Sequence, residues 1–307
     1  MEENTEQRVD LTLFSEKIQE LKDRIASVIV GQEQTVDLVL TAILANGHVL
    51  IEGVPGVAKT LLARLTARLI DADFSRVQFT PDLMPSDVLG TTVFNMKTNG
   101  FDFHQGPIFA DIVLVDEINR APAKTQAALF EVMEERQISI DGTTHRMGDL
   151  YTILATQNPV EQEGTYKLPE AQLDRFLMKI TMDYPSLEEE VNILERHHTN
   201  AALVKLDDIV PAITKEELLS LRAFMNQVFV DRTLLQYIAL IVQQTRTSKA
   251  VYLGASPRAS VAMLQSSKAY ALLQGRDFVT PEDIKFVAPY VLQHRLILTA
   301  EAEMEGY

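Results

Sequence analysis

The sequence predicts an α/β protein in which a parallel sheet lies between layers of helices, followed by a smaller all-helical lid domain. Three observations lead to this prediction. Apolar, strand-like runs alternate with helix-forming stretches before Pro185, which is typical of a parallel sheet covered on both faces. One of these runs ends in a glycine-containing loop that opens directly into a helix. After Pro185 only helical periodicity remains.

The amino-terminal region begins with a polar, acidic stretch, so we expect residues 1–12 to form a disordered tail. Residues 14–46 follow a helical pattern, interrupted by a short apolar turn at residues 29–32. We expect the α/β core to span residues 13–185 and the helical lid to span residues 186–307.

Residues 53–60 read G-V-P-G-V-A-K-T, directly after an apolar run. A strand that ends in a glycine turn and opens into a helix directs backbone N–H groups and the positive end of the helix dipole at one point, where polyphosphate binds. We expect Lys59 to reach the β- and γ-phosphates and the Thr60 hydroxyl to bind Mg²⁺. Ala58 replaces the usual second glycine, at little cost if this residue is already helical. The predicted nucleotide-binding residues of this loop are Gly53, Val54, Pro55, Gly56, Val57, Ala58, Lys59, Thr60 and Leu61.

After the loop helix and the short stretch 77–79, two further apolar strands are predicted, at residues 112–115 and 151–156. Asp116 and Glu117 follow the first, and carboxylates at the carboxyl end of a strand lie where parallel α/β sheets bind ligands. We expect Asp116 to hold Mg²⁺ through water and Glu117 to activate the attacking water. Asn158 follows the other strand and is a candidate to bind the γ-phosphate or that water, although an Asn-Pro turn alone would account for it.

Two hairpins interrupt the alternation of strands and helices. Each consists of two short runs around a dipeptide that tolerates the positive φ angles of tight turns: 91–96 and 101–104 around Asn99-Gly100, and 137–140 and 143–146 around Asp141-Gly142. Neither hairpin lengthens the central sheet in an obvious way. We expect the two hairpins to hold a client protein.

Two arginines are candidates for a role in hydrolysis. Arg175 can stabilise charge on a transferring phosphoryl group, or form an ordinary salt bridge with Asp174 or Glu170. Arg258 lies in the first turn of a helix capped by Ser256, where the helix dipole opposes a cation by roughly 0.3–1 kcal/mol unless an anion lies close by. We expect the γ-phosphate of ATP to be that anion.

The predicted helices of the carboxyl-terminal region have apolar faces at helical spacing. One face contains Leu218, Leu221, Met225 and Val228, and the next contains Leu234, Ile238, Ile241 and Thr245. Farther along, Thr280 is followed by a proline and two acids, which is a well-formed helix start.

Composition limits the classes of function. The chain has 43 acidic and 28 basic residues and a formal net charge of −15, which argues against a surface built to hold nucleic-acid phosphates. It contains no cysteine, so disulfides and thiolate metal sites cannot form. We find no signal-like or membrane-spanning apolar segment. We therefore expect a cytoplasmic protein with no direct membrane insertion and no nucleic-acid partner.

Taken together, the motifs resemble those of the MoxR family of AAA+ ATPases, from about residue 29 to the end of the helical region. The resemblance is carried by G-V-P-G-V-A-K-T, I-V-L-V-D-E-I-N-R-A, A-T-Q-N-P-V-E-Q-E-G-T-Y, L-P-E-A-Q-L-D-R-F and G-A-S-P-R-A. It implies Walker A at residues 53–60, Walker B at Asp116 and Glu117, sensor 1 at Asn158, the arginine finger at Arg175 and sensor 2 at Arg258.

The resemblance also implies that Ile29, Val30, Gly31 and Gln32 lie near adenine. The first hairpin resembles the helix-2 insert of the family, and the second resembles the hairpin before sensor 1. These likenesses imply Mg-dependent ATP hydrolysis in a ring-forming homo-oligomer, usually a hexamer, with ATP at the subunit interfaces. They also imply chaperone-like maturation or activation of a client, often one with a von Willebrand factor A domain.

Three alternatives to a remodelling ATPase remain open. The first is the ATPase motor subunit of a metal-chelatase complex, because the motor of such a complex closely resembles MoxR proteins. The second is a nucleotide-dependent switch with little turnover, which the intact Glu117, Asn158 and Arg175 argue against. The third is a DNA-associated AAA+ motor, which the acidic charge balance and the lack of a helix-turn-helix module disfavour.

Overall fold

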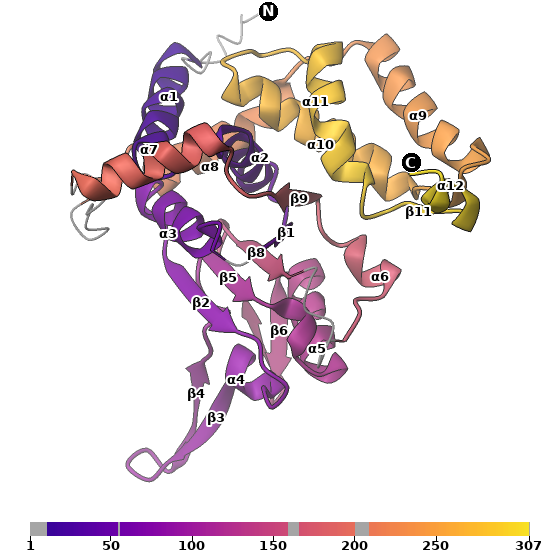
Figure 1. The fold of residues 1–307 in the computed structure, drawn as a ribbon. Coiled ribbons are helices and arrows are strands. Elements are labelled where there is room, and N and C mark those ends of the chain that lie inside the picture. Colours follow the sequence, from indigo (N-terminus) through magenta and orange to yellow (C-terminus); the bar gives the residue numbers. More distant parts are fainter. Residues whose placement is uncertain (1–10, 55, 159–165, 200–208, 307) are drawn as a thin grey trace, which may run out of the picture.

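The computed structural model describes residues 11–54, 56–158, 166–199 and 209–306, without the side chains of Leu11 and Leu13. Its helices are α1 (Leu11–Val28), α2 (Glu33–Leu44), α3 (Lys59–Leu69), α4 (Pro85–Leu89), α5 (Ala123–Glu135), α6 (Glu170–Leu173), α7 (Leu187–His198), α8 (Lys215–Phe224), α9 (Arg232–Thr247), α10 (Pro257–Leu273), α11 (Pro281–Leu292) and α12 (Ala300–Met304). Its strands are β1 (Val49–Gly53), β2 (Phe74–Gln78), β3 (Gly90–Asn95), β4 (Gly100–Gln105), β5 (Ile112–Asp116), β6 (Gln137–Ile140), β7 (Thr143–Arg146), β8 (Thr152–Gln157), β9 (Met178–Met182), β10 (Val251–Leu253) and β11 (Ile297–Leu298). Figure 1 shows their arrangement.

The central sheet has five parallel strands in the order β2-β5-β8-β1-β9. This order places β8 between β1, which precedes the phosphate loop, and β5, which ends in the two acids. Three of the predicted motifs therefore meet at the carboxyl edge of three neighbouring strands. The predicted α/β fold with a parallel sheet between helices is confirmed.

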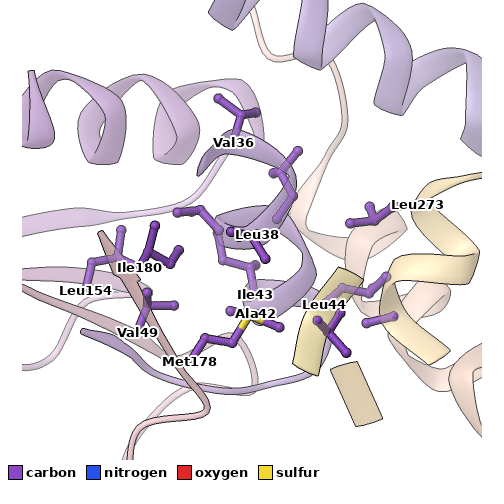
Figure 2. Close-up of a cluster of buried hydrophobic side chains, with 14 of the residues drawn as sticks. Val36, Leu38, Ala42, Ile43, Leu44, Val49, Leu154, Met178, Ile180 and Leu273 are labelled. Atoms are coloured by element: carbon purple, nitrogen blue, oxygen red, sulfur yellow. The ribbon is translucent and has the colours of Figure 1, made fainter. Parts of the chain in front are cut away.

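The two faces of the sheet belong to two hydrophobic clusters, because alternate residues of a strand point to opposite faces. Val49 and Ile51 lie in the cluster formed with α1, α2, α3 and the carboxyl-terminal helices, whereas Leu50 lies in the cluster formed with α5. In Figure 2, α2 side chains such as Leu38 and Ile43 lie between the strands and the carboxyl-terminal helices. One continuous core thus joins the sheet to the helices that follow it.

The strand β9 has no counterpart among the predicted strands. Its alternating burial places Met178, Ile180 and Met182 inside, with the more exposed Lys179 and Thr181 between them. β9 pairs in parallel with β1 and forms one edge of the sheet. The alternation is a signal that the sequence contains, but five residues between two irregular segments are easily missed.

Both predicted hairpins are present as separate two-stranded sheets. β3 pairs with β4 and β6 pairs with β7, both antiparallel. Asp141 and Gly142 have φ angles of 48° and 79°, as the tight turn requires. At the turn of the first hairpin Asn99 has a positive φ of 51°, whereas Gly100 has none and already begins β4. Figure 1 shows β3 and β4 projecting away from the rest of the chain.

The region after Pro185 is mainly helical, but the prediction of helices alone was wrong. β10 and β11 pair antiparallel, with a register shift between Val251 and Leu253. Strands of three and two residues carry no periodic signal, so only their pairing across the tertiary structure reveals them. The predicted apolar face of α8 is confirmed, because Leu218 and Leu221 are buried.

The division into a core and a helical lid stays a prediction. Its expected boundary falls between β9 and α7, yet side chains of α8, beyond that boundary, contact residues of the core. The Lys215 ammonium forms an ion pair with Asp111, and the Arg222 guanidinium donates to the carbonyl oxygens of Asp149 (2.7 Å) and Ile43 (2.6 Å). The helix α10 packs against α2.

The predicted tail is too long by two residues, because α1 already begins at Leu11. The helix is held by a buried stripe of Ile18, Leu21 and Ile25, and its first turn extends amino-terminally from this stripe. The rest of the predicted tail, residues 1–10, lies outside the described residues. Within the described chain, no helix has the length and apolarity that a membrane crossing needs.

Candidate active site

The loop between β1 and α3 has the geometry of a phosphate cradle. Gly56 has φ +91° and is exposed, and a β-carbon at this position would meet no atom within 4 Å. The open side of the loop therefore has room for a ligand. Lys59 is the first residue of α3, and its ammonium donates to the Gly53 carbonyl oxygen at 2.7 Å. Pro55 lies outside the described residues.

Ala58 is not helical, so the condition under which alanine costs little at this position is not met. Ala58 caps α3 with φ 60° and ψ 24°, in the left-handed region. That conformation costs a residue with a β-carbon about 1–2 kcal/mol, because the β-carbon approaches the following carbonyl oxygen. The chain must reverse direction here to enter the helix, and the buried Val57 anchors the turn in the core. The strain at Ala58 thus lies within the predicted phosphate loop.

Three carboxylates act on the Lys59 ammonium. Burial lowers the pKa of Lys59, and the negative charges of Asp116, Glu117 and Glu52 oppose this shift. The lysine of the loop and the two acids that follow β5 therefore share one electrostatic environment, as the sequence analysis expected.

Asp116 is 7% exposed and is held from two sides. The Thr156 hydroxyl donates to its Oδ1 at 3.0 Å, and the Arg76 Nε donates to its Oδ2 at 2.6 Å. Thr60 lies in the first turn of α3, next to Lys59. Hydroxyl and carboxylate oxygens are the ligands that Mg²⁺ takes, so Thr60 and Asp116 fit this ion.

Glu117 has φ 56° and ψ 52°, again in the left-handed region. Its backbone N–H donates to the Thr156 hydroxyl at 3.0 Å. Its carboxylate accepts a hydrogen bond from Gln78 Nε2 at 2.7 Å and pairs with Arg120 Nε at 3.1 Å. The Glu117 carboxylate is thus held by Gln78 of β2 and by Arg120 of the helical turn that follows Glu117.

Arg76, Gln78 and Thr156 were not among the predicted site residues. Arg76 and Gln78 are two residues apart on β2, so both side chains point to the same face of the sheet. Thr156 stands two residues before Asn158 on the strand between β1 and β5. Polar residues near the ends of β2 and β8 indicate a role at the acids only when the strand order, which places both strands next to β5, is known.

Asn158 follows β8 directly and is 9% exposed. Glu52 is paired with Gln157 in the register of β1 and β8, so Asn158 lies level with Gly53 of the phosphate loop. The same strand neighbours β5 on its other side. The position is therefore between the loop and the acids, although its predicted role remains a proposal.

The segment expected near adenine connects α1 to α2. Ile29 is buried, and Gly31 has φ +72°. This positive φ favours glycine, and a β-carbon at Gly31 would also displace the carboxylate of Glu189 on α7, which would lie 2.3 Å from it. A cavity of about 200 Å³ next to this segment is lined by Ile29, Gln32 and residues of α1 and α2.

Arg175 and Arg258 lie at the amino-terminal edge of the sheet, opposite the carboxyl edge where the phosphate loop begins. Arg175 stands just before β9, where the neighbouring Leu177 N–H donates to the carbonyl of His48, the residue before β1. At about 3.3 Å per residue, β1 separates this edge from Gly53 by about 16 Å. Both arginines line a cavity of about 540 Å³ together with residues 45–48, which precede β1. The structure brings the two arginines together, but not to the phosphate loop of the same chain.

The alternative for Arg175, a salt bridge with Asp174 or Glu170, was wrong as to the partner. Its Nε pairs with Glu134 on α5 at 3.1 Å, and its Nη1 donates to the Phe130 carbonyl oxygen. Asp174 is instead bound by Arg295, with 2.7 Å between Nε and Oδ1. Successive side chains point in different directions from the turn after α6, so Asp174 faces Arg295, in the segment after α11, and Arg175 faces α5.

The phosphate loop, the two acids at the adjacent strand end and the parallel sheet define the class of protein: an AAA+ ATPase. A family model described as "ATPase family associated with various cellular activities (AAA)" matches residues 48–178, and a model of the AAA lid domain matches residues 243–307. The chain belongs to the MoxR family of AAA+ ATPases.

Named relatives and a solved structure support this assignment. The chain is 45% identical to Chaperone MoxR1 of Mycobacterium tuberculosis, over 91% of this chain and 75% of that protein. It is 49% identical to the uncharacterised protein YeaC of Bacillus subtilis, over 92% and 88% of the two chains, and 30% identical to Protein MoxR of Methylorubrum extorquens, over 96% and 91%. A crystal structure of an ATPase from Cytophaga hutchinsonii superposes with a TM-score of 0.88 at 41% identity, over 97% and 92% of the two chains.

Proposed function

We propose that the protein hydrolyses ATP with Mg²⁺ at the interfaces of a homo-oligomeric ring and uses the reaction to remodel a client protein. The observation that carries this proposal is the distance of about 16 Å, along β1, between the phosphate loop and the edge at which Arg175 and Arg258 lie. An arginine that stabilises the transferred phosphoryl group must reach the nucleotide. In this chain the two arginines can do so only at the nucleotide of a neighbouring subunit.

The loop residues 53–61 would hold the phosphates, with Lys59 on the β- and γ-phosphates, and residues 29–32 would lie against the base. Thr60 and Asp116 would hold Mg²⁺, which when bound neutralises charge on the β- and γ-phosphates. Glu117 would accept a proton from the attacking water, and Asn158 would orient that water or the γ-phosphate. Arg175 and Arg258 would complete the site from the neighbour.

A head-to-tail interface of this kind closes into a ring when a whole number of successive rotations completes one full turn without a shift along the axis. We propose six subunits, as the resemblance to AAA+ proteins implies. A cytoplasmic location fits a protein that consumes ATP.

The trans arrangement is testable by mixing two inactive variants. Arg175→Ala subunits keep an intact Glu117, and Glu117→Gln subunits keep an intact Arg175. In mixed rings some interfaces combine both intact residues. We expect the 1:1 mixture to regain up to about one quarter of the wild-type ATPase rate, because half of the subunits offer the acid and half of their neighbours offer the arginine. The measurement is steady-state phosphate release.

Co-purification of two differently tagged variants shows that subunits exchange. If exchange occurs and the mixture is no more active than either parent, Arg175 does not act in trans.

The client would be a protein. The hairpin β3–β4 exposes an apolar group at its end, made of Val93, Phe94, Met96 and Phe101. The Phe94 and Phe101 rings are in edge-to-face contact, with 5.3 Å between ring centroids. Solvent-exposed apolar groups on a projecting element mark a protein contact rather than a phosphate contact. One relative carries the name Chaperone, which agrees with this reading, and we propose a client with a von Willebrand factor A domain.

Replacing both phenylalanines with serine is expected to lower the ratio of client-stimulated to basal ATPase rates at least about fivefold, because the apolar contact with the client is lost. The assay uses a purified protein with a von Willebrand factor A domain from the same organism. The matched control replaces Thr92 and Asp102 of the same hairpin with serine. Tight, salt-sensitive binding of the wild-type protein to plain duplex DNA would instead support a nucleic-acid motor.

A further inference from the structure

Glu134 is the meeting point of the two arginines. One carboxylate oxygen of Glu134 lies 3.1 Å from Arg175 Nε, and the other lies 2.6 Å from Arg258 Nη2. Arg175 comes from the turn before β9, and Arg258 comes from the first turn of α10, in the region expected to form the lid. A single side chain of α5 therefore brings together two cations from distant parts of the chain.

The surrounding charges leave no other described carboxylate in this role. Four guanidinium groups line the cavity, those of Arg136, Arg175, Arg258 and Arg295, and the acids that line it with them are Glu134 and Asp174. Asp174 accepts from Arg295 Nε and from the Ser256 hydroxyl, at 2.7 and 3.3 Å. The carboxylate of Glu134 is thus the acid that pairs with both Arg175 and Arg258.

Glu134 also resolves the mismatch at the start of α10. A cation in the first turn of a helix is opposed by the helix dipole, by roughly 0.3–1 kcal/mol. The contact with Glu134 places an anion beside Arg258, so the mismatch disappears without a phosphate. Within one chain, the anion beside Arg258 is therefore the Glu134 carboxylate and not the predicted γ-phosphate.

The pairs contribute little to stability. The Glu134 side chain is 35% exposed, and those of Arg175 and Arg258 are 30% and 57% exposed. Ion pairs of this exposure are worth about 0–1 kcal/mol. The contacts instead fix the orientation of the Arg175 guanidinium. It is bound by two groups of α5 that lie one helical turn apart, the Glu134 carboxylate and the Phe130 carbonyl. The guanidinium plane is set by the helix.

We infer that Glu134 is a positioning residue that holds Arg175 and Arg258 as a pair aimed at the nucleotide of the neighbouring subunit. This inference rests on the proposed trans action of the arginines. Its consequence is that loss of Glu134 damages the side of the interface that donates the arginines and spares the side that holds the nucleotide.

Glu134→Ala is expected to lower the turnover number at least about tenfold, with KM for ATP changed less than about threefold, because the variant's own phosphate loop is intact. Mixing Glu134→Ala with Glu117→Gln subunits should restore activity, as with Arg175→Ala. Mixing Glu134→Ala with Arg175→Ala should restore none, because both variants are defective on the same side. The exposed neighbour Glu135→Ala is the control and should match the wild type.

Glu134→Gln keeps the side-chain shape and tests the charge if the alanine variant melts at a lower temperature. Wild-type turnover in both variants overturns the inference, as does recovery in the mixture of Glu134→Ala with Arg175→Ala. Failure of the mixture of Arg175→Ala with Glu117→Gln, with exchange shown, overturns the trans proposal itself and the inference with it. Recovery in that mixture but not with Glu134→Ala and Glu117→Gln overturns only the inference.

Discussion

Glu117→Gln is expected to lower ATP turnover by roughly 10²–10⁴-fold while ATP affinity changes less than about threefold. The factor is the usual contribution of a positioned general base. Glutamine keeps the shape of the side chain and its contacts with Gln78 and Arg120, so the phosphate loop and the fold are unaffected. Steady-state phosphate release measures turnover, and equilibrium binding of a fluorescent ATP analogue measures affinity.

Two variants make this expectation specific. Lys59→Ala removes the ammonium that the loop holds beside Gly53 and should abolish tight ATP binding. Glu135→Gln changes an exposed acid of α5 and should leave both quantities unchanged. If Glu117→Gln hydrolyses ATP at the wild-type rate, the assignment of the base is wrong.

Acidification from pH 6.5 to pH 5 is expected to lower the free energy of unfolding by roughly 2–3 kcal/mol per pH unit. His48 is buried, with its Nδ1 accepting from Ile153 N–H and its Nε2 donating to the Met133 carbonyl oxygen, both at 3.0 Å. Burial lowers the pKa of His48 to about 3, and the positive charge of Arg136 adds to the shift. Burial and Arg295 likewise lower the pKa of His294 to about 3.

The sign follows from proton binding in the two states. Below pH 6.5 the unfolded chain protonates both imidazoles, whereas the folded chain keeps them neutral until about pH 3. The stability contributed by the neutral imidazoles is therefore complete above pH 6.5 and is lost as the pH falls. Each histidine contributes about 1.4 kcal/mol per pH unit once its unfolded form is fully protonated. Urea unfolding at several pH values measures the slope.

His294→Gln separates the two contributions. The glutamine amide can donate to the Phe176 carbonyl as His294 Nε2 does, but it does not titrate. We expect this variant to show half of the wild-type slope. Replacing the exposed His197 and His198 with asparagine should leave the slope unchanged. A free energy of unfolding that is constant between pH 6.5 and pH 5 would contradict the neutral assignment of the buried histidines.

The fold class and the site motifs could be predicted because their signals are local. The strand, loop and helix around Lys59 follow one another in the chain, and so do β5 and its two acids. Their meeting follows from a general property of parallel sheets, whose carboxyl ends share one edge. β9 could have been predicted from its alternation, whereas β10 and β11 are too short to carry a pattern.

The partners of the site residues could not be predicted, because they depend on distances across the fold. Glu134 is one of several acids near the end of α5, and nothing in the sequence distinguishes it from Glu131 or Glu135. Arg76 was hidden for the same reason, since its contact with Asp116 requires β2 to lie next to β5. Ala58 was misjudged because a residue before a helix carries no mark of its own φ angle.

The position of α2 bears on how the subunit can move. One side of α2 packs on the sheet and the other on α10, and Leu44 and Leu273 lie in the same buried cluster as the strand residues. A hinge between the two parts of the chain would expose such side chains to water, at about 1.5–3 kcal/mol for each large one. Rotation of whole subunits against one another would expose none of these buried side chains. We therefore expect each subunit to move as one rigid body, so that the proposed ring would change shape at the contacts between subunits.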